Sequence, residues 1–353
     1  MTETDNIIID ATARIFQELG DPQTLNNAPD DAWREPLWAA LEESGLTLAW
    51  VPDDLGGAGA DISDGFDILQ TAGRFAVAVP LAETLLAGWA LSKANLQVPQ
   101  GAMSLALSSR ANPLRLMDGK LAGRAEAVPF ASGVDHFVAL AETPDGAAVI
   151  QIDAAACNIE TAMGIGGDPQ GNVRFDGAAP AALAPAPAGI ANETLMLMGA
   201  AARATQMAGA LQGILELAVD YAGERVAFGR PIAKFQAVQH NLAQLAGETA
   251  AAVAAAGSAA DTIHHADNFN EAVFFEVAAA KTRAGEAAGE GAAIAHQVHG
   301  AIGFTDEHIL HRFTRRLWAW RDDFGSESEW AVGLGALVAA NGADQLWPMV
   351  ASR

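Results

Sequence analysis

The stretch ERVAFGRPIAKFQ, residues 224–236, lies between two long helical patterns. Arg225 closes the first pattern, and a guanidinium held at a helix C-terminus can clamp a pyrophosphate. Phe228, a little further on, offers a flat ring for an adenine or a ribose. Each residue also has a purely structural interpretation, since Arg225 could be a solvated helix-end cation and Phe228 could pack in a core.

A second stretch, QVHGAIGF at residues 297–304, follows another helical pattern. Gln297 comes just before Gly300, so an amide and a bare backbone could approach the same dinucleotide. His299 lies within this turn, where a structural hydrogen bond is favoured over a role as an acid or a base. The two stretches together indicate one surface for a dinucleotide.

The chain around both stretches has the periodicity of helices. Apolar residues recur at helical spacing from Met207 to Ala222. Residues 232–266 and 270–298 are rich in alanine, which suits close packing in a bundle. A further helix is predicted from one apolar stripe, formed by Ile309, Phe313, Leu317 and Trp320.

The middle of the chain changes character and favours β-strands. Short apolar runs occur at residues 103–107, 137–142 and 147–152. The residues TPDG, 143–146, separate two of these runs, which is typical of a hairpin. Residues 177–189 carry three prolines among alanines and predict a linker.

The first hundred residues are again helical in pattern, with Pro36 near the start of one helix and Gly45 at its end. The order of patterns predicts a mainly α chain with a small β domain. We expect an N-terminal helical domain at residues 1–102, a middle β domain at 103–180 and a C-terminal four-helix bundle at 190–353.

The composition excludes several classes of function. With 43 acidic and 20 basic side chains the formal charge is −23, which disfavours nucleic acid and anionic membranes as partners. The single cysteine, Cys157, excludes an intrachain disulfide and a cysteine-built zinc site, and we expect no metal. The acidic N-terminus lacks a secretory signal pattern, so we expect a cytoplasmic protein, and the 51% hydrophobic composition favours an oligomer.

The two quoted stretches, at this separation and on this order of elements, resemble the acyl-CoA dehydrogenase family over nearly the whole chain. The resemblance implies FAD as cofactor, an acyl-CoA as substrate and an electron-transfer flavoprotein as electron acceptor. It also implies contacts in trans, across a dimer interface, to the adenosine-diphosphate end of a neighbouring chain's FAD. The residues that match these contacts are Arg225, Phe228, Gln236, Gln297, Gly300 and Ala301.

The half of the flavin site that a chain provides for its own cofactor departs from the family. The family has a Thr-Glu-Pro…Gly-Ser-Asp stretch where residues 104–113 read SLALSSRANP. It has a tryptophan-isoleucine-threonine segment where residues 127–133 read AVPFASG. We therefore expect a shortened β domain with a rewritten cofactor face.

The catalytic base is the second departure. The family's reaction removes a proton α to the thioester while hydride leaves the β carbon, so it needs one carboxylate. At the turn where many members have a glutamate this chain has Phe324, and at the other family position, on the helix before Arg225, it has Gly199. No catalytic residue is therefore assigned, and three nearby carboxylates could substitute only with a backbone shift: Asp322, Asp323 and Glu327.

The chain thus keeps the residues for contacts in trans but lacks a carboxylate at both base positions. In this it resembles the non-catalytic subunit of an α2β2 acyl-CoA dehydrogenase, whose homologous partner subunit carries the base. Such pairs resemble enzymes for bulky, steroid-type acyl-CoA thioesters. We therefore expect a subunit of an FAD-dependent enzyme that desaturates an acyl-CoA between its α and β carbons. The alternatives are an active homo-oligomer with a relocated carboxylate, a flavin monooxygenase on the same fold, and a scaffolding protein that binds no flavin.

Overall fold

A computed structural model of the chain describes residues 3–109 and 111–351. They fall into two compact units, of which the first comprises Met1–Asp21, Ala28–Leu69 and Val77–Met198, and the second Pro22–Asn27, Gln70–Ala76 and Gly199–Arg353. The chain is mainly helical with a smaller β region, which confirms the predicted fold class. The three domain boundaries drawn from the sequence stay a prediction.

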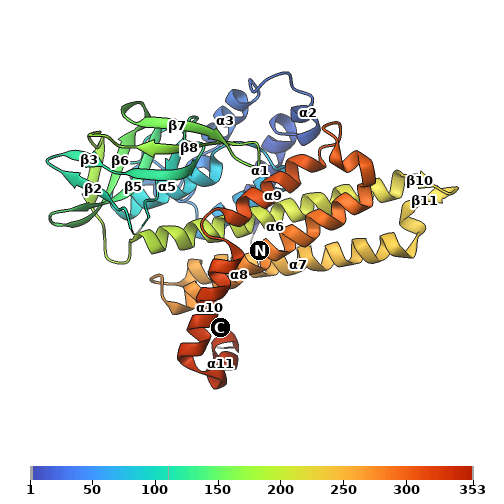
Figure 1. Cartoon of the computed structure of the whole chain (residues 1–353). Coiled ribbons are helices and arrows are strands. Elements are labelled where there is room, and N and C mark those ends of the chain that lie inside the picture. Colours follow the sequence, from blue (N-terminus) through green and yellow to red (C-terminus); the bar gives the residue numbers. More distant parts are fainter. Residues whose placement is uncertain (1–2, 110, 352–353) are drawn as a thin grey trace. The chain divides into compact units, whose positions relative to one another are not determined.

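The helices of the first unit surround a buried helix beside the sheet. Helix α5 (Leu81–Lys93) has every residue from Leu81 to Leu91 buried, and it packs against strand β1 (Figure 1). Gly45, with a φ of 71°, ends α3 as its sequence predicts. The other elements of this helical part are α1 (Glu3–Leu19), α3 (Arg34–Glu43), the beginning of α4 (Ile62–Phe75), η1 (Leu46–Leu48) and η2 (Asp53–Leu55).

The β region consists of two sheets that share one apolar core. The larger sheet has the order β3-β2-β5-β6-β9, with β1 also paired to β5, and the smaller has the order β4-β8-β7. Phe137 and Phe175 meet edge to face in this core, with ring centroids 6.3 Å apart. The strands are β1 (Met103–Leu105), β2 (Leu114–Met117), β3 (Lys120–Ala122), β4 (Arg124–Pro129), β5 (His136–Thr143), β6 (Gly146–Asp153), β7 (Asn158–Met163), β8 (Pro169–Arg174) and β9 (Ala182–Pro185), with a short turn η3 (Ala154–Ala156).

One hairpin prediction is confirmed, and the prediction of a linker is partly wrong. Strands β5 and β6 pair with Thr143 opposite Gly146, so the TPDG residues do form a tight hairpin. Residues 182–185, however, form β9, which pairs antiparallel with β6 and places Ala184 opposite Val149. Proline and alanine are tolerated there because β9 is an edge strand, whose outer side needs no partner.

The second unit is a helical bundle built from small residues. Helix α7 (Gln236–His265) packs along α8 (Glu271–His299), and both bury alanines against their neighbours. The stripe predicted on α9 (Leu310–Asp322) is confirmed, since Ile309, Phe313, Leu317 and Trp320 are all buried. The remaining elements are α2 (Pro22–Asn26), most of α6 (Asn192–Glu224), β10 (Val226–Ala227), β11 (Arg230–Pro231), η4 (Ile232–Lys234), η5 (Gly300–Phe304), α10 (Glu327–Asn341), η6 (Ala343–Gln345) and α11 (Leu346–Ala351).

Two glycines allow backbone contact within this unit. A Cβ atom on Gly73, near the end of α4, would lie 2.3 Å from the carbonyl oxygen of Gln206 on α6. A Cβ atom on Gly209 would lie 2.0 Å from the carbonyl oxygen of Gln70. Any larger residue at either position would therefore push the end of α4 away from α6.

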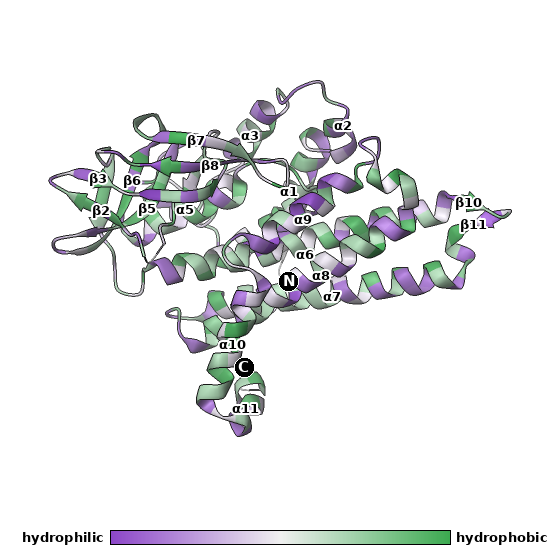
Figure 2. Cartoon of the chain, viewed as in Figure 1, coloured by the Kyte–Doolittle hydropathy of each residue, from purple (hydrophilic) through white to green (hydrophobic). Residues whose placement is uncertain are grey.

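Helix α10 is apolar in composition yet has no buried residue (Figure 2). In the part of the chain that the structure describes, no helix combines the length and the apolarity that crossing a bilayer requires.

Candidate functional site

A two-residue hairpin loop presents Phe228 at one end of the bundle. Ala227 on β10 lies opposite Arg230 on β11, and the two residues between them both have positive φ, 51° at Phe228 and 80° at Gly229. This is the conformation of a type I′ turn. It strains a phenylalanine by roughly 1–3 kcal/mol, yet the Phe228 side chain is 97% exposed. A strained and exposed ring is typical of a contact surface rather than of a core.

Arg225 stands at the base of this hairpin with its backbone fixed. Its N–H donates to the carbonyl of Tyr221 at 2.8 Å, and its carbonyl accepts from the N–H of Ile232 at 2.8 Å. The side chain is exposed, and no residue within 3–109 or 111–351 forms an ion pair with it. Gln236, the first residue of α7, is also exposed. The guanidinium is therefore available to an anionic ligand.

The second predicted stretch forms the end of α8 and the turn η5. Gln297 is exposed on the last turn of α8, and Gly300 and Ala301 are exposed at the start of η5. Gly300 has a φ of 62°, and a Cβ atom there would meet no atom within 4 Å. The main chain at Gly300 is therefore open to the close approach of a ligand.

One ring stack joins the two stretches. Tyr221 near the end of α6 lies against His299 at the end of α8, with ring centroids 4.6 Å apart and planes 25° from parallel. Figure 1 shows the ends of both helices at the same end of the bundle as the β10–β11 hairpin. The structure thus brings to one end of this unit all six residues predicted to contact a cofactor: Arg225, Phe228, Gln236, Gln297, Gly300 and Ala301.

The turn predicted to have lost its base lies directly against Gly199. Phe324, between α9 and α10, has a φ of 54°. A Cβ atom on Gly199 of α6 would lie 2.2 Å from ring atom Cδ1 of Phe324, so the ring covers this glycine. The two positions that the resemblance predicts for a base therefore lie against each other, and they hold an aromatic ring and a bare backbone.

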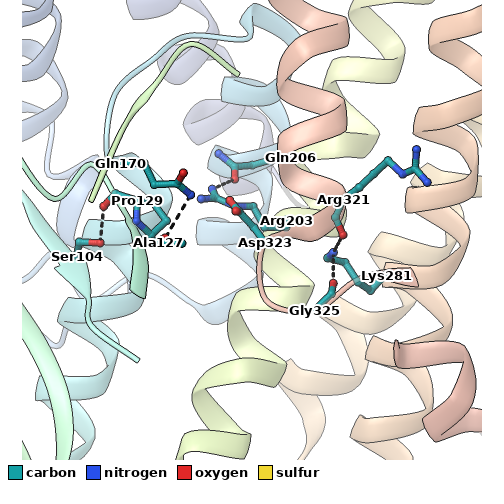
Figure 3. A network of polar contacts seen from close by, with 10 residues as sticks. All are labelled: Ser104, Ala127, Pro129, Gln170, Arg203, Gln206, Lys281, Arg321, Asp323 and Gly325. Carbon is teal, nitrogen blue, oxygen red and sulfur yellow. Dashed lines mark hydrogen bonds and ion pairs between the residues drawn. The ribbon is translucent and has the colours of Figure 1, made fainter. Parts of the chain in front are cut away.

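Two of the three neighbouring carboxylates are paired with arginines. Asp323 accepts a hydrogen bond from Nε of Arg203 at 2.9 Å (Figure 3). Glu327 is paired with Arg321; burial opposes its ionisation, but the hydrogen bond from Arg321 leaves the pKa of this carboxyl below its usual value. Asp322 is exposed. A carboxylate held ionised by a guanidinium is a weaker proton acceptor than a free one.

A fully buried lysine fixes the same turn. Nζ of Lys281 on α8 donates to the carbonyls of Arg321 and Gly325, each at 2.7 Å (Figure 3). Burial lowers the pKa of Lys281 to about 8. From the other side, Nε1 of Trp330 donates to the carbonyl of Phe324 at 3.0 Å. The ring of Phe324 is therefore held in place by bonds to the backbone around it.

Arg203 and Lys281 were not among the predicted site residues, because arginine and lysine side chains in a helix pattern are mostly exposed. Arg203 is 2% exposed, donates to Gln206 at 2.6 Å, and places its guanidinium 5.7 Å from the centroid of the Phe324 ring. Its signal was its position inside the long run of small and apolar residues after Gly199. A charge in such a run is costly unless it is paired.

In the β region, polar side chains form hydrogen bonds with the backbone of residues 127–129, which lie in one of the two segments predicted to depart from the family. Oγ of Ser104 donates to the carbonyl of Pro129 at 2.8 Å, and Nε2 of Gln170 donates to the carbonyl of Ala127 at 3.3 Å (Figure 3). Strand β4 has a bulge at this point, and Ala127 has a φ of 51°. These polar side chains thus satisfy the backbone of the β region itself.

The chain is similar to known proteins over most of its length. The family profile described as "Acyl-CoA dehydrogenase, C-terminal domain" matches residues 189–321. Acyl-CoA dehydrogenase IpdE2 of Mycobacterium tuberculosis is 32% identical over 296 residues, which are 82% of either chain.

Two solved structures share the fold. A chain of the ChsE4-ChsE5 complex from Mycobacterium tuberculosis superposes with a TM-score of 0.86 at 23% identity, covering 97% of this chain and 99% of that one. A chain described as the Tcur3481-Tcur3483 steroid ACAD G363A variant superposes with a TM-score of 0.83 at 24% identity, covering 96% of this chain and 98% of that one.

Proposed function

The chain belongs to the acyl-CoA dehydrogenase family, whose cofactor is FAD, and from this premise we propose that it is the non-catalytic subunit of a heteromeric acyl-CoA dehydrogenase. A homologous partner subunit carries the catalytic base and holds the flavin ring. This chain contacts the adenosine-diphosphate end of the same FAD. The observation that carries the proposal is the contrast between an available dinucleotide surface and a base position filled by Phe324.

The residues at the hairpin end fit the proposed part of FAD. Arg225 offers a charge-assisted donor for a pyrophosphate oxygen, on a backbone already fixed by its bonds to Tyr221 and Ile232. The exposed ring of Phe228 suits stacking on a base or a ribose. Gln297 supplies an amide, and the open main chain at Gly300 admits close approach.

The turn around Phe324 supports the absence of a base from this chain. Proton abstraction needs a carboxylate that faces the substrate and is free to accept a proton. Asp323 and Glu327 are instead tied to Arg203 and Arg321. The bonds that fix this turn also oppose the backbone shift that either carboxylate would need.

In this arrangement the chain's residues bind and orient rather than react. When bound, FAD accepts the hydride that leaves the β carbon of the acyl group. Arg225 and Gln297 hold the distant end of the dinucleotide, which fixes where its ring lies in the partner subunit. We expect the electrons to leave through an electron-transfer flavoprotein.

The names of the similar structures support the choice of partner and substrate. One is described as the ChsE4-ChsE5 complex, and the other, whose name also joins two designations, as the Tcur3481-Tcur3483 steroid ACAD variant. We therefore propose a homologous dehydrogenase chain as the partner, in an α2β2 assembly, and a bulky, steroid-type acyl-CoA as the substrate.

Native mass spectrometry tests the proposal on two samples. One is this chain alone with added FAD, and the other is the assembly isolated through an affinity tag on this chain. We expect no stoichiometric FAD and no acyl-CoA oxidation with the chain alone, and both in the assembly. A homo-oligomer with one FAD per subunit that oxidises acyl-CoA would overturn the proposal, and Asp322→Asn, Asp323→Asn and Glu327→Gln would then locate its base.

Replacing Arg225 tests the contact itself. In the assembly, Arg225→Ala should weaken FAD binding about 10- to 100-fold, the usual loss for a hydrogen bond to a charged group. The matched control is Arg34→Ala, which also removes one positive charge. Arg34 forms an ion pair with Asp31, and both residues are far from Arg225 in the sequence. Equal FAD occupancy in both variants would contradict a role for Arg225 in binding FAD.

A further inference from the structure

A group of aromatic and imidazole rings lies directly beneath the two proposed FAD-contacting stretches. Besides its stack on Tyr221, the ring of His299 meets the ring of His308 at 4.6 Å between centroids. His308 also lies edge-on to Tyr221 at 6.2 Å. Nearby, His296 stacks on Phe304 of η5 at 4.4 Å. The ring of His299 is buried and those of Tyr221 and His308 are half-buried, whereas Phe304 is exposed.

One hydrogen bond of this group, accepted by His308, requires a neutral imidazole. Nδ1 of His308 accepts the N–H of Leu310 at 3.1 Å and thereby satisfies a free donor at the start of α9. A proton on that nitrogen would remove this bond. Nδ1 of His299 faces the carbonyl of Ala295 at 2.7 Å, so this nitrogen is the donor of that ring.

The surroundings also oppose a positive charge. Burial lowers the pKa of His296, His299 and His308, and the neighbouring imidazoles lower it further for His296 and His308. His311 on α9 lies beside these three histidines, and its Nδ1 is hydrogen-bonded to the carbonyl of His308 at 2.8 Å. Tyr221 is the titratable group that faces it from α6.

Charged side chains do not stabilise the protonated form of these imidazoles. Asp306 and Glu307 lie in the preceding loop and are exposed, while Arg312 and Arg315 on α9 are cations. Within the described residues, no carboxylate forms an ion pair with His296, His299 or His308.

Each ring of the stack is joined through the backbone to one of the two stretches. The carbonyl of Tyr221 accepts the N–H of Arg225, where the hairpin begins. His299 directly precedes Gly300, where η5 begins, and the N–H of Gly300 donates to the carbonyl of His296. A shift of either ring would therefore move one stretch relative to the other.

We propose that Tyr221 and His299, braced by neutral His308, are positioning residues that hold the two FAD-contacting stretches in register, and that acid releases both together. The functional part of this inference rests on the proposed function, because it assumes that the stretches contact FAD. The structural part says only that the two stretches are coupled and acid-sensitive, and it does not depend on FAD binding. The two parts have separate tests.

Hydrogen exchange on the full chain tests the coupling without FAD. Rates corrected for the intrinsic effect of pH are compared at pH 7.5 and 5.5 for the amides of Arg225 and Ile232 in one stretch and Gly300 and Thr305 in the other. We expect both pairs to exchange at least tenfold faster at pH 5.5. Unchanged protection, or loss in one stretch only, would overturn the proposal.

Four variants separate positioning from general stability. Tyr221→Leu should expose both stretches at either pH, whereas Tyr221→Phe, which keeps the ring, should match the wild type. His308→Asn should lose at least part of the acid response, because its side-chain oxygen can accept the N–H of Leu310 and takes up no proton, whereas His296 and His299 remain titratable. The control is His240→Asn, an exposed histidine on α7, which should keep the wild-type response.

The FAD content of the isolated assembly tests the functional part. Tyr221→Leu should lower it and Tyr221→Phe should not. If Arg225→Ala lowers FAD occupancy but Tyr221→Leu does not, the positioning role is refuted while the proposed function stands. If Arg225→Ala leaves FAD unchanged, the proposed function fails, and the exchange data still decide whether the two stretches are coupled.

Discussion

Substituting Gly199 by alanine tests whether the ring of Phe324 packs directly on this glycine. A Cβ atom at this position would lie 2.2, 2.4 and 2.5 Å from three ring atoms of Phe324. The shortest of these distances is more than about 1 Å below van der Waals contact. The ring would have to move, although Trp330 and Lys281 fix the backbone around it.

The expected destabilisation follows from two opposing terms. Overpacking a well-filled site costs about 1–3 kcal/mol. Replacing glycine by alanine inside a helix returns about 1 kcal/mol. Gly199→Ala should therefore lower the free energy of unfolding by up to about 2 kcal/mol. In a Phe324→Ala background the clash is gone, so the same substitution should be neutral or stabilising.

A double-mutant cycle measures this coupling. The urea midpoints of the wild type, Gly199→Ala, Phe324→Ala and the double variant are followed by far-ultraviolet circular dichroism. We expect a coupling free energy of about 2 kcal/mol, within the range for residues in direct contact. Gly247→Ala is the control, because a Cβ atom there meets nothing within 4 Å. A Gly199→Ala variant as stable as this control would refute the packing described for Phe324.

Three further outcomes are expected. Phe228→Asn should stabilise the chain by up to about 1 kcal/mol in thermal unfolding, because asparagine tolerates the φ of 51° better, yet it should lower the FAD content of the assembly. Lys281 has a pKa of about 8 in the folded chain, below its ordinary 10.5, so the unfolded chain binds more protons between these values. Stability should therefore rise with pH across this window, by at most about 1.4 kcal/mol per unit, and Lys281→Met should abolish that slope. Burial first and Asp153 second raise the pKa of Cys157 to about 11, so alkylation by iodoacetamide at pH 8 should be roughly 100-fold slower than in the denatured chain.

The proposed FAD surface could be predicted from the sequence because its signals are local. Arg225 and Phe228 are only three positions apart, and a helix end followed by a two-residue turn is enough to place them. Gln297 and Gly300 likewise span less than one helical turn before the chain changes direction. The proposed loss of a base also rests on residue identity alone, since Phe324 and Gly199 carry no carboxylate wherever they lie.

The packing around Phe324 could not be predicted, because it depends on residues far apart in the chain. Gly199, Arg203 and Lys281 each contact the turn that contains Phe324 from a different point in the sequence. The periodicity of a helix shows which residues share a face, but it does not show which other helix that face meets. Burial of a cation becomes visible only when its partners are in place.

Strand β9 shows the same limit in the β region. Its two alanines and its proline have little strand propensity, and pairing with β6 outweighs this.

The sequence by itself determined the fold class, and it contains the two stretches that we propose to contact FAD and the two positions, Gly199 and Phe324, without a carboxylate. These depend on residue identity and on spacings of a few residues. The tertiary structure alone decided that Phe324 covers Gly199, that Asp323 is paired with Arg203, and that Tyr221 stacks on His299. Such contacts arise when burial of apolar surface brings distant segments together. Because the hydrophobic effect has no preferred direction, only the packed fold decides which segments meet.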